Sequence, residues 1–230
     1  MKILDVKDLN IVINGASVLE NINFEVRRAE VLAVIGPNGA GKTVLLKALL
    51  GLIPYTGSIV WSPGVKRGYV PQRMDIETDV PLTVREFFRL RGGVVADAKI
   101  KEALGYVQLD PNVLDRGLGE ISVGQRQRIL VAWAVLGSPD VLLFDEPTAD
   151  IDIAGQESIY NMLYNLQKDM GLTIILVSHD LNIVFRHAHT VICLNRKSLC
   201  MGVPKQVLTT EQLFALYGGE GALFEHKHDH

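Results

Sequence analysis

Residues 36–43 read Gly-Pro-Asn-Gly-Ala-Gly-Lys-Thr, and they constrain the fold of this chain more than any other stretch. An apolar run, residues 31–35, precedes them and a second apolar segment, residues 44–50, follows. This order predicts a strand, a glycine-rich loop and a helix, the context in which the pattern G-x-x-x-x-G-K-[ST] binds phosphate. Glycines let the backbone wrap closely around phosphate, so that N–H groups and the helix N-terminus face negative charge. A turn that only joins a strand to a helix is disfavoured, because both spacing and context match.

The loop therefore predicts a nucleoside triphosphate site. Lys42 is expected to reach the β- and γ-phosphates, and the Thr43 hydroxyl is expected to bind Mg²⁺. The residues expected to hold the nucleotide here are Gly36, Pro37, Asn38, Gly39, Ala40, Gly41, Lys42 and Thr43.

A phosphate loop also needs a carboxylate for Mg²⁺ and a group that positions a nucleophilic water. The apolar run 141–144 is followed by Asp145 and Glu146, which places two acids at the end of one buried strand. We expect Asp145 to hold Mg²⁺ through its water shell and Glu146 to polarise the attacking water. The alternative is a pair of acids in a strand-ending turn, which Pro147 would also suit.

Composition limits the remaining function classes. A chain of 230 residues can bury a sizeable core and predicts one domain, residues 1–230. The formal net charge of −3 gives no basic footprint for nucleic acid. Residues 1–5 lack the apolar core of a signal peptide, and no apolar run approaches the length of about 18 residues that a membrane span needs. These features together predict a cytoplasmic protein.

The two cysteines, Cys193 and Cys200, would lie opposite each other in a hairpin that turns at residues 196–197. A disulfide is conceivable. A reducing cytosol favours two buried thiols instead.

The pattern along the chain predicts an α/β fold with a mainly parallel core sheet, an N-terminal antiparallel β-subdomain and an inserted α-helical subdomain. Residues 3–30 indicate strands joined by a hairpin turn at Asn14-Gly15. Residues 81–137 contain the expected helical insertion. Continuous apolar runs at 141–145 and 173–177 are typical of parallel strands buried on both faces. Residues 219–230 form a histidine-containing tail.

Three helix starts are predicted inside the insertion. Thr83 caps the first, with Glu86 at the capping-box position. Asp97 is expected to cap the second, and Ser122 the third. A serine cap followed by glycine exposes backbone N–H groups at the positive end of the helix dipole, which makes a second phosphate-binding surface.

The order of these motifs resembles the ATP-binding subunit of an ATP-binding cassette (ABC) transporter along nearly the whole chain. The matching stretches are 36–43 as Walker A, 69–72 as Q-loop, 121–125 as the family signature, 141–146 as Walker B, 149–152 as D-loop and 177–180 as H-loop.

The resemblance implies ATP with Mg²⁺ as cofactors and a head-to-tail homodimer, in which ATP is sandwiched between one P-loop and the partner's signature helix. Ser122, Gly124 and Gln125 would meet the nucleotide held by the other protomer. Gln72 would meet Mg²⁺ and the attacking water, and would relay nucleotide state to membrane partners. His179 would contact the γ-phosphate. The resemblance also implies that Asp152 organises the interface between the two sites.

Three residues depart from the family pattern. Val123 replaces the first glycine of the signature, although a β-branched side chain is tolerable in the first turn of a helix. Ile13 stands where the family has an aromatic residue that stacks on adenine, so base discrimination is expected to weaken. Trp133 replaces a common arginine, and it lies on the apolar stripe of its helix, which favours a core role.

The narrower resemblance is to ATPase subunits of zinc/manganese-type importers, through residues 69–73, 80–84 and 213–218. It implies integral membrane permease subunits and a substrate-binding protein as partners, no nucleic acid, and a place on the cytoplasmic face of the cell membrane. The tail adds His226, His228 and His230, which could gather a metal ion or could form a plain polar tail.

Two other functions stay open. One is a soluble ABC-type ATPase in DNA repair or translation, which would favour tandem cassettes, a coiled-coil insertion or a basic face. The other is a weakly hydrolysing ATP-dependent scaffold, which Val123 and Ile13 make worth testing.

Overall fold

The computed structural model of the protein describes residues 1–72, 81–92, 95–147 and 151–218. The chain divides into a first unit, Met1–Ser62 with Leu176–His230, and a second unit, Pro63–Ile175. Strand β7 (Thr173–Val177) begins in the second unit and ends in the first.

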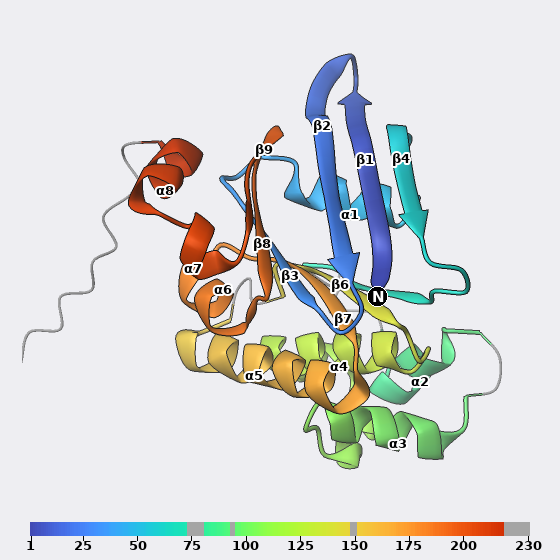
Figure 1. Cartoon of the computed structure of the whole chain (residues 1–230). Helices are drawn as coiled ribbons and strands as arrows, with labels where there is room; N and C mark the ends of the chain where they lie inside the picture. The colour runs from blue at the N-terminus through green and yellow to red at the C-terminus, as the bar shows by residue number, and fades with distance from the viewer. Residues whose placement is uncertain (73–80, 93–94, 148–150, 219–230) are drawn as a thin grey trace, which may run out of the picture. The chain divides into compact units, whose positions relative to one another are not determined.

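An antiparallel sheet occupies the N-terminal part of the first unit (Figure 1). Its strands are β1 (Lys2–Ile13), β2 (Ala16–Arg27) and β4 (Thr56–Trp61), in the order β2-β1-β4. Asn14 and Gly15 both have positive φ, 50° and 79°, as a tight hairpin turn requires. The predicted antiparallel start of the chain is confirmed. The pairing of β4 with β1 was not predicted, because period-two patterning does not reveal a strand's partner.

The first unit also contains a parallel strand pair that belongs to the second, six-stranded sheet. All five residues of β3 (Val31–Ile35) are buried, and β3 pairs in parallel with β8 (Thr190–Asn195). Strand β8 pairs antiparallel with β9 (Lys197–Gly202). Helices α6 (Leu181–His187), α7 (Pro204–Val207) and α8 (Thr210–Tyr217) contribute to a shared core with these strands. The buried members of that core are Ala33, Ile35, Val184, Val191, Cys193, Leu208 and Leu216.

Cys193 and Cys200 are joined in a disulfide, so the expectation of two thiols is wrong. They are directly paired residues of β8 and β9, with Cα atoms 4.9 Å apart. That separation lies within the range that disulfides require. The expectation used the redox compartment as its argument and gave the strand register too little weight.

The second unit combines a parallel strand pair with helices. Strand β5 (Arg67–Val70) pairs in parallel with β6 (Val141–Asp145), and β7 follows β6 in the strand order. Helix α4 contacts β5, α3 and α5. The helices are α2 (Val84–Arg89), α3 (Asp97–Tyr106), α4 (Val123–Val135) and α5 (Ile153–Met170), with 3₁₀ turns at Pro111–Asp115 and Leu118–Glu120. An antiparallel N-terminal sheet, parallel core strands and helices together confirm the predicted fold class.

The predicted helix caps are correct in two of three cases. Thr83 caps α2, and the Glu86 side chain completes the capping box by accepting from the Thr83 N–H at 2.8 Å. Ser122 caps α4. Asp97 is not a cap, because Ala96 holds that position and Asp97 is the first residue of α3. The Asp97 carboxylate instead forms an ion pair with Arg85.

Trp133 packs among the helices of the second unit but is only half-buried, so its predicted core role is met in part. Its ring lies 6.0 Å from the Phe87 ring, and the Arg91 guanidinium lies 4.7 Å from the Trp133 ring centroid. Arg91 also donates to the Trp133 carbonyl oxygen. Burial lowers the pKa of Arg91.

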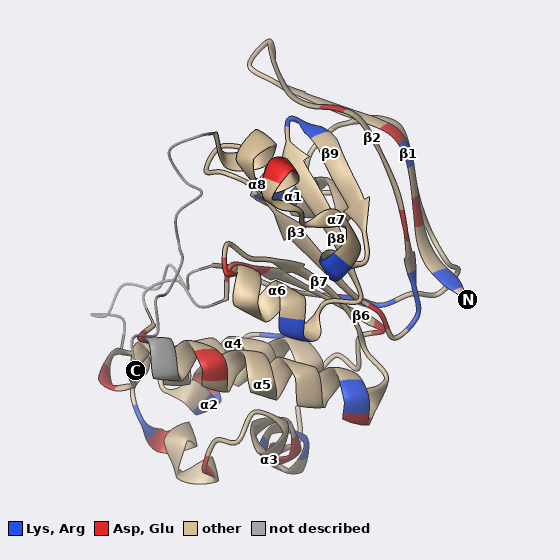
Figure 2. Cartoon of the chain, turned by 60° about the vertical axis from the view of Figure 1, so that its left-hand side comes forward, with Lys and Arg blue, Asp and Glu red and all other residues tan. Residues whose placement is uncertain are grey.

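Charges of both signs are interspersed along α3 and α5 (Figure 2). Among the described residues, no helix is long and apolar enough to cross a membrane.

Helix α2 offers a direct test of which side of the helix is packed. Phe88 is 1% exposed, whereas Leu90, its neighbour at the helix end, is 67% exposed. Phe88→Ala should lower the free energy of unfolding by about 3–5 kcal/mol, since it removes a buried ring and leaves a cavity. Leu90→Ala should change it by less than about 0.5 kcal/mol. Urea denaturation followed by circular dichroism measures both, and equal losses would contradict the packing of α2.

Candidate nucleotide-binding and hydrolysis site

The predicted site residues fall in both units. The first unit contains residues 36–43, Ile13 and His179, and the second contains Gln72, Asp145, Glu146, Ser122, Gly124, Gln125 and Asp152. Residues 149 and 150 of the predicted D-loop and the tail 219–230 lie outside the described residues.

The phosphate loop closes around the ammonium group of Lys42. Lys42 is 7% exposed, and its Nζ donates to the Gly36 carbonyl at 2.8 Å and to the Pro37 carbonyl at 3.1 Å. Asn38 and Gly39 are exposed at the tip of the loop. The loop therefore carries a positive charge at its centre, with the tip accessible to an anionic ligand.

Helix α1 (Lys42–Leu49) begins at the end of this loop. Its N-cap, Gly41, has φ 95° in the left-handed region and makes no side-chain cap. A Cβ atom at Gly41 would lie 2.6 Å from the Leu19 side chain, so glycine is required by both conformation and packing. Because no side chain caps this end, the helix N-terminus suits phosphate oxygens.

Main-chain hydrogen bonds support the same loop from β8 and β9. The Arg196 N–H donates to the Ala40 carbonyl at 3.3 Å, and the Glu20 N–H donates to the Arg196 carbonyl at 2.9 Å. The turn between β8 and β9 thus links the phosphate loop to β2.

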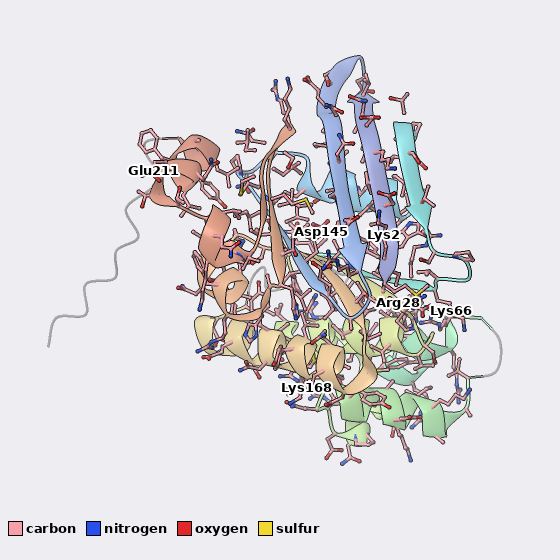
Figure 3. All side chains as sticks on the ribbon, in the orientation of Figure 1. Lys2, Arg28, Lys66, Asp145, Lys168 and Glu211 are labelled. Carbon is pink, nitrogen blue, oxygen red and sulfur yellow. A yellow bond between two sulfur atoms is a disulfide. The ribbon has the colours of Figure 1, made fainter. Side chains whose placement is uncertain are left out.

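In the second unit, Asp145 lies at the carboxyl end of β6 and is 3% exposed (Figure 3). The Tyr69 hydroxyl, from β5, donates to Asp145 Oδ2 at 3.4 Å. Burial and then the charge of Asp145 raise the pKa of Tyr69 to about 12. Tyr69 therefore keeps its proton at neutral pH and acts towards Asp145 as a hydrogen-bond donor.

Glu146 follows directly and is linked to the predicted Q-loop residue. Gln72 Nε2 donates to Glu146 Oε2 at 3.2 Å. The backbone of Glu146 has φ 45°, which a residue other than glycine adopts uncommonly. Strained conformations of this kind cluster at functional sites. The turn holds the Glu146 carboxylate half-buried, beside an exposed amide.

The predicted signature segment opens helix α4. The Gln125 N–H donates to Ser122 Oγ at 3.2 Å, and the Ser122 N–H donates to Gln125 Oε1 at 3.1 Å, which makes a complete capping box. Val123 is the first helical residue and is 42% exposed, so the helix forms despite the departure from the family pattern. A Cβ atom at Gly124 would meet nothing within 4 Å. Packing among the described residues therefore gives no reason for glycine at that position.

The other predicted residues lie at element ends. His179 is exposed between β7 and α6, and Asp180 caps α6 by accepting from the Asn182 N–H at 2.8 Å. Ile13 ends β1 and is 39% exposed. Asp152 caps α5, where its Oδ1 accepts from the Gly155 N–H at 2.8 Å.

The chemistry of the donor set fits Mg²⁺. Mg²⁺ prefers oxygen ligands and is commonly held by one or two carboxylates together with substrate phosphates and water. In the second unit, Asp145 supplies a buried carboxylate and Gln72 an amide oxygen, and in the first unit Thr43 supplies a hydroxyl next to the phosphate loop. Among the described residues, no group of three or more histidine, cysteine, aspartate or glutamate side chains could hold a metal ion alone.

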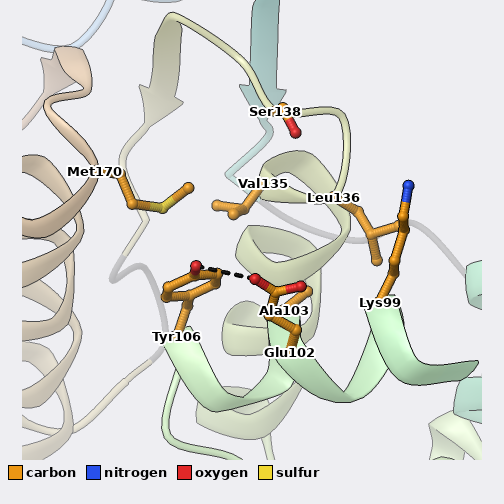
Figure 4. A pocket seen from close by; sticks show the side chains of 8 residues that line it. All are labelled: Lys99, Glu102, Ala103, Tyr106, Val135, Leu136, Ser138 and Met170. Carbon is orange, nitrogen blue, oxygen red and sulfur yellow. Dashed lines mark hydrogen bonds between the residues drawn. The ribbon is translucent and has the colours of Figure 1, made fainter.

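A cavity of about 160 Å³ lies elsewhere in the second unit, beside α3 and the ends of α4 and α5 (Figure 4). Its wall includes Tyr106, whose hydroxyl donates to Glu102 Oε1 at 3.2 Å. None of the predicted site residues lines this cavity.

The sequence reasoning missed Tyr69 as a site residue, although it quoted the stretch that contains it. The register of β5 against β6 pairs Tyr69 with Leu143 and Val70 with Phe144. That register brings the ring of Tyr69 towards the carboxylate at the end of β6. A single sequence does not reveal which strands are neighbours, so the signal was absent.

Comparison with known proteins identifies the family to which this chain belongs. A family model described as ABC transporter matches residues 19–149, more than half of the chain. The zinc import ATP-binding protein ZnuC of Yersinia pestis bv. Antiqua is 39% identical over 227 residues, covering 96% of this chain and 89% of the relative. The protein of that name from Pseudomonas fluorescens is 38% identical, covering 99% and 88%.

This chain is also similar to solved structures of ABC transporter proteins. A metal-chelate type ABC transporter in an inward-facing conformation matches with a TM-score of 0.84 and 29% identity, covering 94% of this chain and 88% of that chain. An ATP-binding cassette in its ADP conformation matches in fold, with a TM-score of 0.80 at 20% identity and 96% coverage of both chains. The chain belongs to the ABC transporter family, as one of its ATP-binding subunits.

Gly124 gives a stability test of the signature helix. Gly124→Ala should raise the free energy of unfolding by about 0.4–1 kcal/mol, because the added methyl meets no atom and restricts the unfolded chain. Gly155→Ala is the matched control, since its Cβ would lie 2.5 Å from Ile151 and 2.7 Å from Asp152 Oδ1. It should destabilise the protein. Thermal unfolding distinguishes the two, and a loss of stability in Gly124→Ala would mean that the glycine serves this chain's own fold.

Proposed function

We propose that this chain is the ATP-hydrolysing subunit of a membrane importer for zinc. The observation that carries the proposal is the pair of carboxylates at the end of β6, one buried and held by Tyr69, the other hydrogen-bonded to Gln72. A metal-binding carboxylate beside a water-polarising one is what hydrolysis of a phosphate anhydride requires.

Zinc as the cargo rests on the relatives. The curated proteins quoted above are named as zinc import ATP-binding proteins and match this chain along nearly its whole length. The resemblance also covers manganese importers, which makes manganese the competing cargo in any transport test.

Hydrolysis proceeds with little covalent work by the protein, because catalysis of phosphoryl transfer is mostly positioning and charge stabilisation. Lys42 leaves the carbonyl groups of Gly36 and Pro37 and pairs with the β- and γ-phosphates. The α1 N-terminus receives phosphate oxygens. Glu146 accepts a hydrogen bond from the attacking water and takes up its proton, while Gln72 orients that water. His179 contacts the γ-phosphate.

Mg²⁺, when bound with ATP, neutralises charge that develops on the phosphate oxygens. Asp145 would hold it through water, with Thr43 and Gln72 as further oxygen donors.

The working unit is a head-to-tail homodimer, in which α4 of one protomer faces the nucleotide of the other. Gly124 supports this, since neither its backbone conformation nor its packing against the residues that the structure describes calls for glycine there. A partner's phosphate that approaches the backbone does call for it. Ser122 and Gln125 then present the first turn of α4, and Asp152 lies at the interface.

The partners are integral membrane permease subunits, with a substrate-binding protein that acts through the permease. The chain would lie on the cytoplasmic face of the cell membrane, and the cysteine bridge would then have to form in a reducing compartment. The tail 219–230 is a candidate metal-binding segment that need not lie on the transport path.

The alternative of a soluble ATPase in DNA repair or translation is not favoured, because the relatives quoted above are import subunits. The alternative of a weakly hydrolysing scaffold depends on Val123 and Ile13, and the rate of ATP hydrolysis decides it.

Two variants separate binding from hydrolysis. Glu146→Gln should lower the ATPase rate by about a hundredfold or more, because the amide is not a general base. It should retain ATP and form an ATP-dependent dimer in size-exclusion chromatography. Lys42→Ala should lose both ATP binding and the dimer.

Glu211→Gln, which alters an exposed acid in the first turn of α8, is the control and should behave as the wild type. A Glu146→Gln protein that stays monomeric with ATP would contradict the sandwich.

The cargo is tested by growth of a strain that lacks the gene. Under zinc limitation, the wild-type gene should restore growth and zinc uptake, whereas the Glu146→Gln gene should not. Growth that is restored only under manganese limitation would reassign the cargo. Restoration by the Glu146→Gln gene would rule out an ATPase motor.

A further inference from the structure

Two side-chain hydrogen bonds connect the end of β5 and the residues after it to the two carboxylates that follow β6. Tyr69 donates to Asp145 at 3.4 Å, and Gln72, three residues later, donates to Glu146 at 3.2 Å. Both pairs belong to the second unit. Because β5 and β6 are paired in parallel, the two contacts follow one another in the same order on both segments.

The hydroxyl of Tyr69 is directed to a group that needs a fixed orientation. Asp145 is 3% exposed, so water can supply few of the hydrogen bonds that an ionised carboxylate needs. The Tyr69 hydroxyl donates to Oδ2 of this carboxylate and thereby fixes the direction of one of its oxygens. Within the part of the chain that the structure describes, Asp145 is the side-chain partner of the Tyr69 hydroxyl.

We infer that Tyr69 is a positioning residue for the metal-binding carboxylate: its hydroxyl sets the orientation in which Asp145 receives a divalent cation. The inference rests on the proposed role of Asp145 towards Mg²⁺. It adds that the segment carrying Gln72 controls both the metal carboxylate and the water-polarising carboxylate. A shift of this segment therefore changes metal affinity and the placement of Glu146 together.

The cation makes the orientation matter. Mg²⁺ demands near-ideal octahedral geometry and usually keeps several of its waters, so a carboxylate that holds the ion through those waters has to keep one orientation. Loss of a residue that orients a metal ligand commonly costs about 10–100-fold in metal affinity. The 3.4 Å separation is longer than the usual 2.7–2.8 Å of an O–H···O bond, so we expect the lower end of that range.

The test uses Tyr69→Phe in the full chain, with Mn²⁺ as a spectroscopic substitute for Mg²⁺. Mn²⁺ binding to the ADP-loaded protein is followed by electron paramagnetic resonance, so no turnover is needed. Tyr69→Phe should raise the half-saturating Mn²⁺ concentration about tenfold. ADP affinity in the presence of EDTA and the metal-free melting temperature should stay at the wild-type values.

Tyr106→Phe is the matched control, because it removes the same hydroxyl from a tyrosine–carboxylate bond outside the site, at 3.2 Å from Glu102 (Figure 4). It should leave the half-saturating Mn²⁺ concentration unchanged. Wild-type Mn²⁺ binding by Tyr69→Phe would overturn the inference. So would a tenfold weakening accompanied by an equal loss of ADP affinity in EDTA, which would indicate a structural role. A wild-type protein that binds neither ADP nor Mn²⁺ would instead refute the proposed function.

Discussion

The burial of Asp145 is the constraint on which the arrangement of the second unit depends. A carboxylate at 3% exposure costs several kcal/mol unless hydrogen bonds or a cation compensate it. Strand β6 places it there because its other four residues are apolar and fully buried, so the strand end cannot move outwards without exposing them. The Tyr69 hydroxyl, from β5, supplies one of these hydrogen bonds. Asp145 therefore links the packing of the buried strand β6 to the proposed binding of the metal ion.

A structural feature could be predicted from the sequence when it depends on residues that lie close together along the chain. The phosphate loop, the Asn14-Gly15 turn and the caps at Thr83 and Ser122 depend on residues close together in sequence, and each was predicted correctly. Asp97 was misplaced by one position because acidic residues are favoured both at the cap and in the first turn.

Two of the features that sequence reasoning did not predict depend on pairing between distant strands. The pairing of β4 with β1 and the Tyr69–Asp145 hydrogen bond both require a register that periodicity leaves open. The disulfide was missed for another reason, because the two cysteines were expected to face each other but the redox argument favoured thiols. The roles proposed for Ser122 and Gly124 are different again, since they would involve a second copy of the chain. Family resemblance suggested them, and no contact among the described residues requires glycine at 124.

The turn between β8 and β9 has a consequence for sequence variation. It holds the phosphate loop through the N–H of Arg196 and the carbonyl of Ala40, both main-chain groups. Substitution of the side chain at position 196 leaves these groups in place, provided that the new residue tolerates φ 59°. The conformation of the phosphate loop therefore does not depend on which side chain stands at position 196. Selection on this turn should act on backbone conformation, and relatives should vary in side-chain charge there while keeping residues that tolerate the left-handed region, such as glycine or asparagine.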